Sequence, residues 1–135
     1  MSLPLRWQFA YSVGVHTFDE AHRVLIERAD ALIAAVKGPN PASRARDIAD
    51  DLVECAVEHF EEEERVLREL DWPGLPEHEQ AHSLLLRTLL KFKADLRYGR
   101  LSAEEAAAFI TDWVLAHIQD EDMQYTAYLH ARGMH

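Results

Sequence analysis

The sequence has little of what membrane, secreted or nucleic-acid-binding proteins usually need. No run of about 18 apolar residues suggests a membrane span, and the N-terminal MSLPLRWQFA lacks the basic-then-apolar pattern of a signal peptide. The one cysteine, Cys55, cannot form an internal disulfide, which agrees with a reducing compartment. A net charge of −10 disfavours nucleic acid and anionic membranes as partners. We therefore expect a cytoplasmic protein that binds neither.

Glycine and proline are also scarce, with five of each, and most of them lie in three short segments. These segments separate stretches with the apolar periodicity of helices. Asn40 before Pro41, and Ser102 with Glu105, are typical of helix starts. The sequence thus predicts one domain over residues 1–135, with an irregular leader and four helices. The expected bounds are 1–17 for the leader and about 18–37, 41–70, 76–98 and 103–131 for the helices.

Within each predicted helix, the apolar residues recur every three or four positions and form one narrow stripe that faces a common core. The connections are short, so neighbouring helices run antiparallel. The predicted fold class is all-α, an up-down-up-down antiparallel four-helix bundle.

Seven polar residues interrupt these apolar stripes or lie next to them. A lone histidine on such a stripe is more often an ordinary core residue, but all seven fall at the same end of an antiparallel bundle. A buried carboxylate without a partner is also costly. A shared metal site explains the whole set. Its candidate ligands are His22, His59, Glu63, His78, His82, His117 and Asp122.

The composition of this set indicates the number and kind of metal ions. Seven side chains are more than one octahedral ion can hold, and zinc usually takes about four ligands, so two ions fit better. If both carboxylates and an oxygen atom bridge the two ions, one coordination position stays open for a small ligand. Imidazole dominates the set, which favours iron, manganese or copper over magnesium or calcium.

Residues 78–82, HEQAH, also match the zinc-hydrolase motif HExxH, in which Glu79 would be the general base. Glu79 lies about 100° from the apolar stripe of its helix. A hydrolase would also leave the ligands on the other helices unexplained. We interpret Glu79 as a first-turn acidic residue that the helix dipole favours.

The ligand pattern resembles that of the hemerythrin family, in particular its single-domain bacterial members. The resemblance covers nearly the whole chain, through FDEAH around His22, HFEEEE from His59, HEQAH, and HIQDED from His117. It implies a non-haem di-iron centre, Fe²⁺ or Fe³⁺, bridged by Glu63, Asp122 and an oxo or hydroxo group.

The resemblance also implies how the ligands divide. One iron would be held by His78, His82 and His117, and the other by His22 and His59, beside an open position for O₂. An apolar pocket would cover that position. The expected pocket residues are Leu25, Phe60, Trp113, Val114 and Ile118, for which ordinary core packing is an equally compatible role.

The spacing of His117 and Asp122 does not suit a regular α-helix. Five residues apart, they point about 140° away from each other. We therefore hypothesise a local π-bulge at this point in the fourth helix.

Several other polar residues lie outside the ligand pattern. We interpret Cys55 as a small packed residue, with lining of the metal site as the alternative. The remaining residues are expected at the solvated surface, and they are Glu61, Glu62, Glu64, His16, His130 and His135.

The function that the resemblance implies is reversible O₂ binding for transport, storage or delivery, which makes this a binding protein rather than an enzyme. Two alternatives stay open. One is a sensor that reports O₂ or redox state to an unidentified partner, and the other is an enzyme acting on peroxide or nitric oxide, or a protein that handles iron itself. An unidentified protein that receives the oxygen is a further expected partner.

Overall fold

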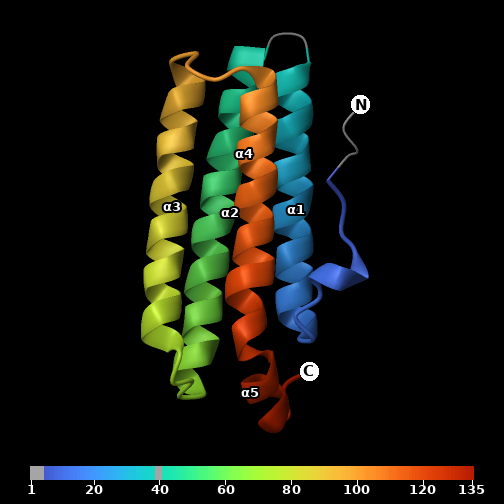
Figure 1. Ribbon diagram of the computed structural model, residues 1–135, viewed down its shortest axis with the longest axis vertical. Coiled ribbons are helices and arrows are strands. Elements are labelled where there is room, and N and C mark those ends of the chain that lie inside the picture. Colours follow the sequence, from blue (N-terminus) through green and yellow to red (C-terminus); the bar gives the residue numbers. More distant parts are fainter. Residues whose placement is uncertain (1–4, 39–40) are drawn as a thin grey trace.

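The computed structural model describes residues 5–38 and 41–135, with the side chains of residues 41–43 and 119–123 excepted. Four long helices lie side by side and alternate in direction along the chain (Figure 1). They are α1 (His16–Lys37), α2 (Pro41–Glu69), α3 (Leu75–Arg97) and α4 (Ala103–Leu115). The predicted all-α antiparallel four-helix bundle is confirmed.

The residues at the starts of α2 and α4 explain why these helices begin where they do. Pro41 is the first residue of α2, and its fixed φ and missing N–H suit that position. Ser102 caps α4 through a complete capping box, because its hydroxyl accepts from the Glu105 N–H and the Glu105 carboxylate accepts from the Ser102 N–H. Asn40, the other expected cap, lies outside the described residues.

The predicted fourth helix, 103–131, is divided into several helical segments. After α4 the chain forms a π-helix, η2 (Ala116–Glu121), then a 3₁₀-helix, η3 (Asp122–Tyr125), and a short α5 (Thr126–Ala131). In Figure 1, α5 extends beyond the lower end of the bundle. The hypothesis of a π-type break after His117 is confirmed, since the π-helix contains that residue.

The leader is largely irregular, as predicted, but it contains a short 3₁₀-helix, η1 (Phe9–Tyr11), and α1 begins at His16 rather than at residue 18. Asp19 in the first turn of α1 attaches the leader to the bundle. Its carboxylate accepts from the Ser12 hydroxyl at 2.6 Å and from the Val13 N–H at 2.7 Å. The leader is therefore held against the bundle by hydrogen bonds.

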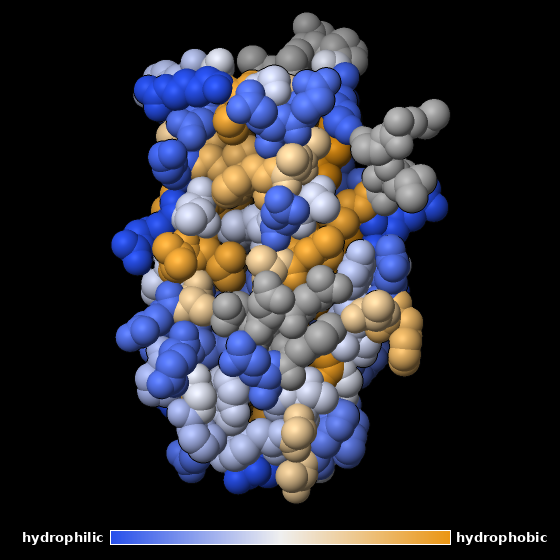
Figure 2. Space-filling view, viewed as in Figure 1, coloured by the Kyte–Doolittle hydropathy of each residue, from blue (hydrophilic) through white to orange (hydrophobic). Residues whose placement is uncertain are grey.

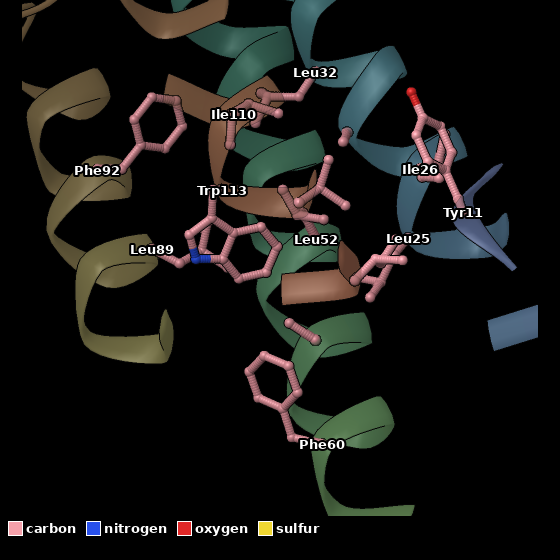
Figure 3. Close-up of a cluster of buried hydrophobic side chains, with 14 of the residues drawn as sticks. Tyr11, Leu25, Ile26, Leu32, Leu52, Phe60, Leu89, Phe92, Ile110 and Trp113 are labelled. Carbon is pink, nitrogen blue, oxygen red and sulfur yellow. The ribbon is translucent and has the colours of Figure 1, made fainter. Parts of the chain in front are cut away.

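Apolar side chains from all four helices fill the interior of the bundle (Figure 3). Leu25, Leu52 and Ile110 are completely buried, and Trp113 is only 4% exposed. Burying each side chain of this size stabilises the fold by about 1.5–3 kcal/mol relative to leaving it in water. In the described part of the chain, no helix combines the length and the apolar character needed to cross a membrane.

Candidate metal centre

A layer of buried imidazole and carboxylate side chains lies in the half of the bundle where α1 begins and α2 ends. Each of the four long helical runs contributes to it, and every member is at most 6% exposed. The sequence predicts all of them as ligands. They are His22 of α1, His59 and Glu63 of α2, His78 and His82 of α3, and His117 of η2.

Glu63 lies at the centre of this layer, and its two carboxylate oxygens face different histidines. Oε1 lies 2.6 Å from Nε2 of His78 and 3.1 Å from Nε2 of His82. Oε2 lies 3.2 Å from Nε2 of His59 and 3.6 Å from Nε2 of His22. One carboxylate thus joins histidines of three helices.

Tyr125 completes the surroundings of Glu63, although the ligand pattern of the sequence assigns it no role. Its hydroxyl donates to Glu63 Oε2 at 3.1 Å, and the residue is fully buried. Its ring makes edge contacts with Phe18, Trp72 and His78, at centroid distances of 5.4, 5.9 and 5.7 Å. These contacts fix the hydroxyl at the carboxylate. In the sequence, Tyr125 continues the apolar stripe of the fourth predicted helix, about one turn after Asp122.

His117 lies between the two groups of histidines. Its Nε2 is 2.9 Å from Nε2 of His59, and its ring centroid lies 5.0 Å from that of His59 and 5.2 Å from that of His82. The π-helix shifts the helical phase at this point, because its hydrogen bonds span five residues. Asp122 follows five residues later, but its side chain lies outside the described residues, so its role as a ligand stays a prediction.

The ligand atoms form two groups that share Glu63. One group contains His22, His59 and His117, and the other contains His78 and His82. The resemblance instead implied that His117 joins His78 and His82. The structure places the His117 nitrogen closer to the first group, while its ring lies almost equally far from His59 and His82. The spacing of His117 from the other candidate ligands in the sequence therefore does not decide which of the two groups it joins.

The chemistry of the cluster suits metal ions. A fully buried carboxylate needs positive charge or hydrogen-bond donors to offset its desolvation. Imidazole nitrogens and carboxylate oxygens together are suitable donors for iron, and a single carboxylate with oxygens facing two groups is the arrangement of a bridging ligand. The His/Glu cluster therefore fits a di-iron site.

The predicted apolar pocket residues are all buried. Leu25, Val114 and Ile118 are 0% exposed, and Phe60 and Trp113 are each 4% exposed. Figure 3 shows Leu25, Phe60 and Trp113 on three different helices. Large apolar side chains therefore lie buried in the same bundle interior as the His/Glu cluster.

The Phe60 ring contacts histidines of both groups, and its centroid lies 4.9 Å from that of His117. Its ring stacks on His82, with centroids 4.2 Å apart and planes 12° apart, whereas the His59 ring is 5.8 Å away. Trp113 is held by a hydrogen bond from its Nε1 to the Leu85 carbonyl at 2.8 Å. Phe60 thus packs against His82 of the second group and His117 of the first.

The prediction that Glu64 is a solvated surface residue is wrong. Its side chain is 20% exposed, and its Oε2 lies 3.7 Å from Nδ1 of His82. Both residues line a cleft of about 130 Å³ between α2 and α3. Partial burial raises the pKa of the Glu64 carboxyl, while the charge of His82 acts in the opposite direction. Glu61 and Glu62 are exposed, as predicted.

His130 is also not simply a surface residue. It is half-buried, and its Nε2 donates to the Gly14 carbonyl at 2.7 Å, so α5 is attached to the leader. His16 and His135 are exposed, as predicted. The contact of His130 with Gly14 is difficult to predict from the sequence, because the two residues are more than 100 positions apart.

Glu79 does not behave as a catalytic base. Its side chain is 42% exposed, and its carboxylate lies 3.5 Å from the Arg68 guanidinium on the surface. Cys55 is partly exposed, and burial raises the pKa of its thiol. Neither residue belongs to the groups of candidate ligand atoms. The zinc-hydrolase interpretation of HEQAH therefore has no support in the geometry.

Comparison with known proteins shows the family of this chain. The family model described as Hemerythrin HHE cation binding domain matches residues 13–129. The chain belongs to the hemerythrin family. Myohemerythrin from Riftia pachyptila is 28% identical over 126 residues, covering 93% of this hemerythrin-family chain and 94% of the relative. Bacteriohemerythrin from Stenotrophomonas maltophilia (strain R551-3) is 24% identical over 121 residues, covering 90% and 78%.

Solved hemerythrin structures share the fold. Wild-type hemerythrin superposes with a TM-score of 0.81 at 20% identity, covering 93% of this chain and 97% of that one. A hemerythrin variant with one substitution gives a TM-score of 0.81 at 22% identity, covering 94% and 97%. The four-helix bundle of this hemerythrin-family chain is thus that of the solved structures.

Proposed function

We propose that this hemerythrin-family chain binds O₂ reversibly at a non-haem di-iron centre, for transport, storage or delivery of oxygen. The proposed ligands are His22, His59, Glu63, His78, His82, His117 and Asp122. The observation that supports this most strongly is the convergence of imidazole nitrogens from α1, α2 and α3 on the two oxygens of one buried carboxylate.

When bound, two ferrous ions supply one electron each, which O₂ can accept and return. The protein side chains would keep this exchange reversible. Glu63 would bridge the ions because its two oxygens face different histidine groups. Tyr125 would hold that carboxylate in place by donating to Oε2. Leu25, Val114 and Ile118 would exclude water, so that bound oxygen is not displaced by solvent.

The division of ligands between the ions is part of the proposal. We propose that His78, His82 and His117 hold one iron, and that His22 and His59 hold the iron with the open position. The central placement of the His117 ring is compatible with this division. A crystal structure of the iron-loaded protein tests it, and an ion held jointly by His22, His59 and His117 would contradict it.

Reversible oxygenation can be measured directly. The protein is stripped with a chelator, loaded anaerobically with Fe²⁺, exposed to air and then flushed with argon, while iron content and visible absorption are followed. We expect two irons per chain and an absorption that appears in air and disappears under argon. Absorption that persists after O₂ is removed would contradict the carrier function. Turnover of many equivalents of peroxide or nitric oxide per site would favour an enzyme instead.

A pair of variants tests the ligand assignment. His78→Ala removes one of the two nitrogens that face Glu63 Oε1, and we expect it to lower the iron content to one ion per chain or less. His16→Ala changes an exposed histidine outside the cluster and should retain two irons. Equal iron content in both variants would contradict the role of His78.

A further inference from the structure

A second hollow lies at the end of the bundle opposite the metal centre. It has a volume of about 320 Å³ and lies between the C-terminal ends of α1 and α3 and the N-terminal ends of α2 and α4. Val36, which lines it, is 14 residues after His22 on α1, or about 20 Å along the helix axis. This hollow is therefore separate from the proposed di-iron centre.

Small side chains create this hollow. Ala45 and Ala49 of α2 line it together with Ala103 and Ala106 of α4, whereas larger residues fill the middle of the bundle. The remaining apolar lining comes from Val36, Leu96 and Leu101. An unfilled apolar hollow weakens packing in proportion to its volume. A ligand with an apolar body would recover those contacts.

Three cationic side chains line the same hollow, namely Arg46 of α2 and Lys93 and Arg97 of α3. Lys93 is paired with Asp50, with Nζ and Oδ1 2.5 Å apart. Within the described part of the chain, no ion pair involves Arg46 or Arg97, and both are exposed. Two guanidinium groups are therefore accessible to an anion at the edge of an apolar hollow.

The charge of this end differs from that of the rest of the chain. Residues 36–51 and 90–106 carry seven lysines and arginines against six carboxylates, although the whole chain has a net charge of −10. The local charge is therefore close to balanced, or slightly positive, while the remainder is strongly acidic. A small anion is repelled least at this end.

An apolar surface continues outside the hollow. Figure 2 shows hydrophobic residues in the upper half of the molecule on both sides of α4, toward α3 and toward α1, with more hydrophilic residues between them. The three cations also line an adjacent hollow with Leu90 and Tyr98, which are 44% and 64% exposed. The three cations thus have apolar side chains on more than one side, which suits an amphipathic molecule.

We propose that this end of the bundle, formed by the hollow and its three cations, binds a monocarboxylate with an extended apolar chain. The guanidinium groups of Arg46 and Arg97 bind the carboxylate, since Arg and carboxylate form charge-assisted, bidentate hydrogen bonds. The chain occupies the alanine-lined hollow. A water molecule takes about 30 Å³ in the liquid and a methylene group is of similar size, so the hollow has room for about ten chain atoms.

Isothermal titration calorimetry on the metal-loaded protein tests this site, with decanoate as the probe at concentrations below micelle formation. We expect saturable binding of one decanoate per chain. Decanol lacks the carboxylate and butyrate lacks the long chain, so each should bind at least about tenfold more weakly. Decanol that binds as tightly as decanoate, or the absence of saturable decanoate binding, would overturn the proposal.

Two matched pairs of variants locate the site. Arg97→Gln removes one guanidinium and should weaken decanoate binding about tenfold, whereas Arg87→Gln changes an exposed arginine elsewhere on α3 and should not. Ala103→Leu fills part of the hollow from a half-exposed position, and Ala108→Leu makes the same change at an exposed position outside it. Decanoate affinity that is equal within either pair would place the binding elsewhere and refute the assignment.

Discussion

The hydrogen bond between Tyr125 and Glu63 gives the sharpest test of how the buried cluster is held. Tyr125→Phe removes only the hydroxyl that donates to Glu63 Oε2, over 3.1 Å, and retains the ring that contacts Phe18, Trp72 and His78. The substitution leaves almost no cavity. Both Tyr125 and Glu63 are fully buried, so water cannot easily replace the lost donor.

The expected loss of stability follows from the burial of this hydrogen bond and from the charge of its acceptor, the Glu63 carboxylate. A hydrogen bond to a charged group contributes about 1.5–3 kcal/mol to stability, and a buried acceptor that loses its donor adds to the loss. For a domain of this size, 1 kcal/mol corresponds to about 3–4 °C in Tm. We therefore expect Tyr125→Phe to lower the free energy of unfolding by about 1.5–3 kcal/mol and Tm by about 5–12 °C.

Urea and thermal unfolding, followed by circular dichroism, measure this loss. The matched control is Tyr98→Phe, because Tyr98 is 64% exposed and should change stability by less than about 0.5 kcal/mol. Both variants are measured with and without iron, since a bound metal stabilises the native state. Equal stability changes in the two variants would refute the assigned role of the Tyr125 hydroxyl.

Three further substitutions or modifications test other parts of the structure. Glu79→Gln should leave iron content and O₂ binding unchanged, because Glu79 faces Arg68 on the surface; loss of either would revive the hydrolase-type role. Burial raises the pKa of the Cys55 thiol and so lowers its thiolate fraction at pH 8. Alkylation of Cys55 by iodoacetamide should therefore be slower than that of free cysteine at pH 8, and its pH–rate profile should have a higher midpoint. An unshifted midpoint would contradict this. Gly14→Ala should lower the free energy of unfolding by about 1–3 kcal/mol in urea titrations, since Gly14 has φ +77° and a Cβ there would lie 2.9 Å from the His130 ring; unchanged stability would show that the leader can shift.

Local patterns were sufficient for the four helices and for most of the buried cluster. The apolar stripes alternate every three to four residues, and Glu63, His78 and His82 lie on those stripes, so their burial follows from helix geometry alone. The five-residue spacing of His117 and Asp122 was likewise enough to predict a break in the fourth helix, because a regular α-helix would separate them.

Such patterns could not predict the contacts between residues that are far apart in the chain. Phe60 was expected near His22 and His59, and its ring also stacks on His82, a contact that depends on how α2 and α3 pack together. Glu64 is one residue from the stripe and was assigned to the surface, yet the approach of α3 partly covers it. Both contacts depend on the neighbouring helix, whose position the pattern of a single helix does not specify.

The sequence by itself determined the four-helix bundle and the membership of the His/Glu cluster, because helix periodicity specifies which face each residue occupies. Only the tertiary structure decided how the cluster is arranged around Glu63, that Tyr125 donates to it, and that His130 attaches α5 to the leader. Those features depend on distances between residues that are far apart in the chain. Such distances are set by the packing of whole helices, which no local pattern records.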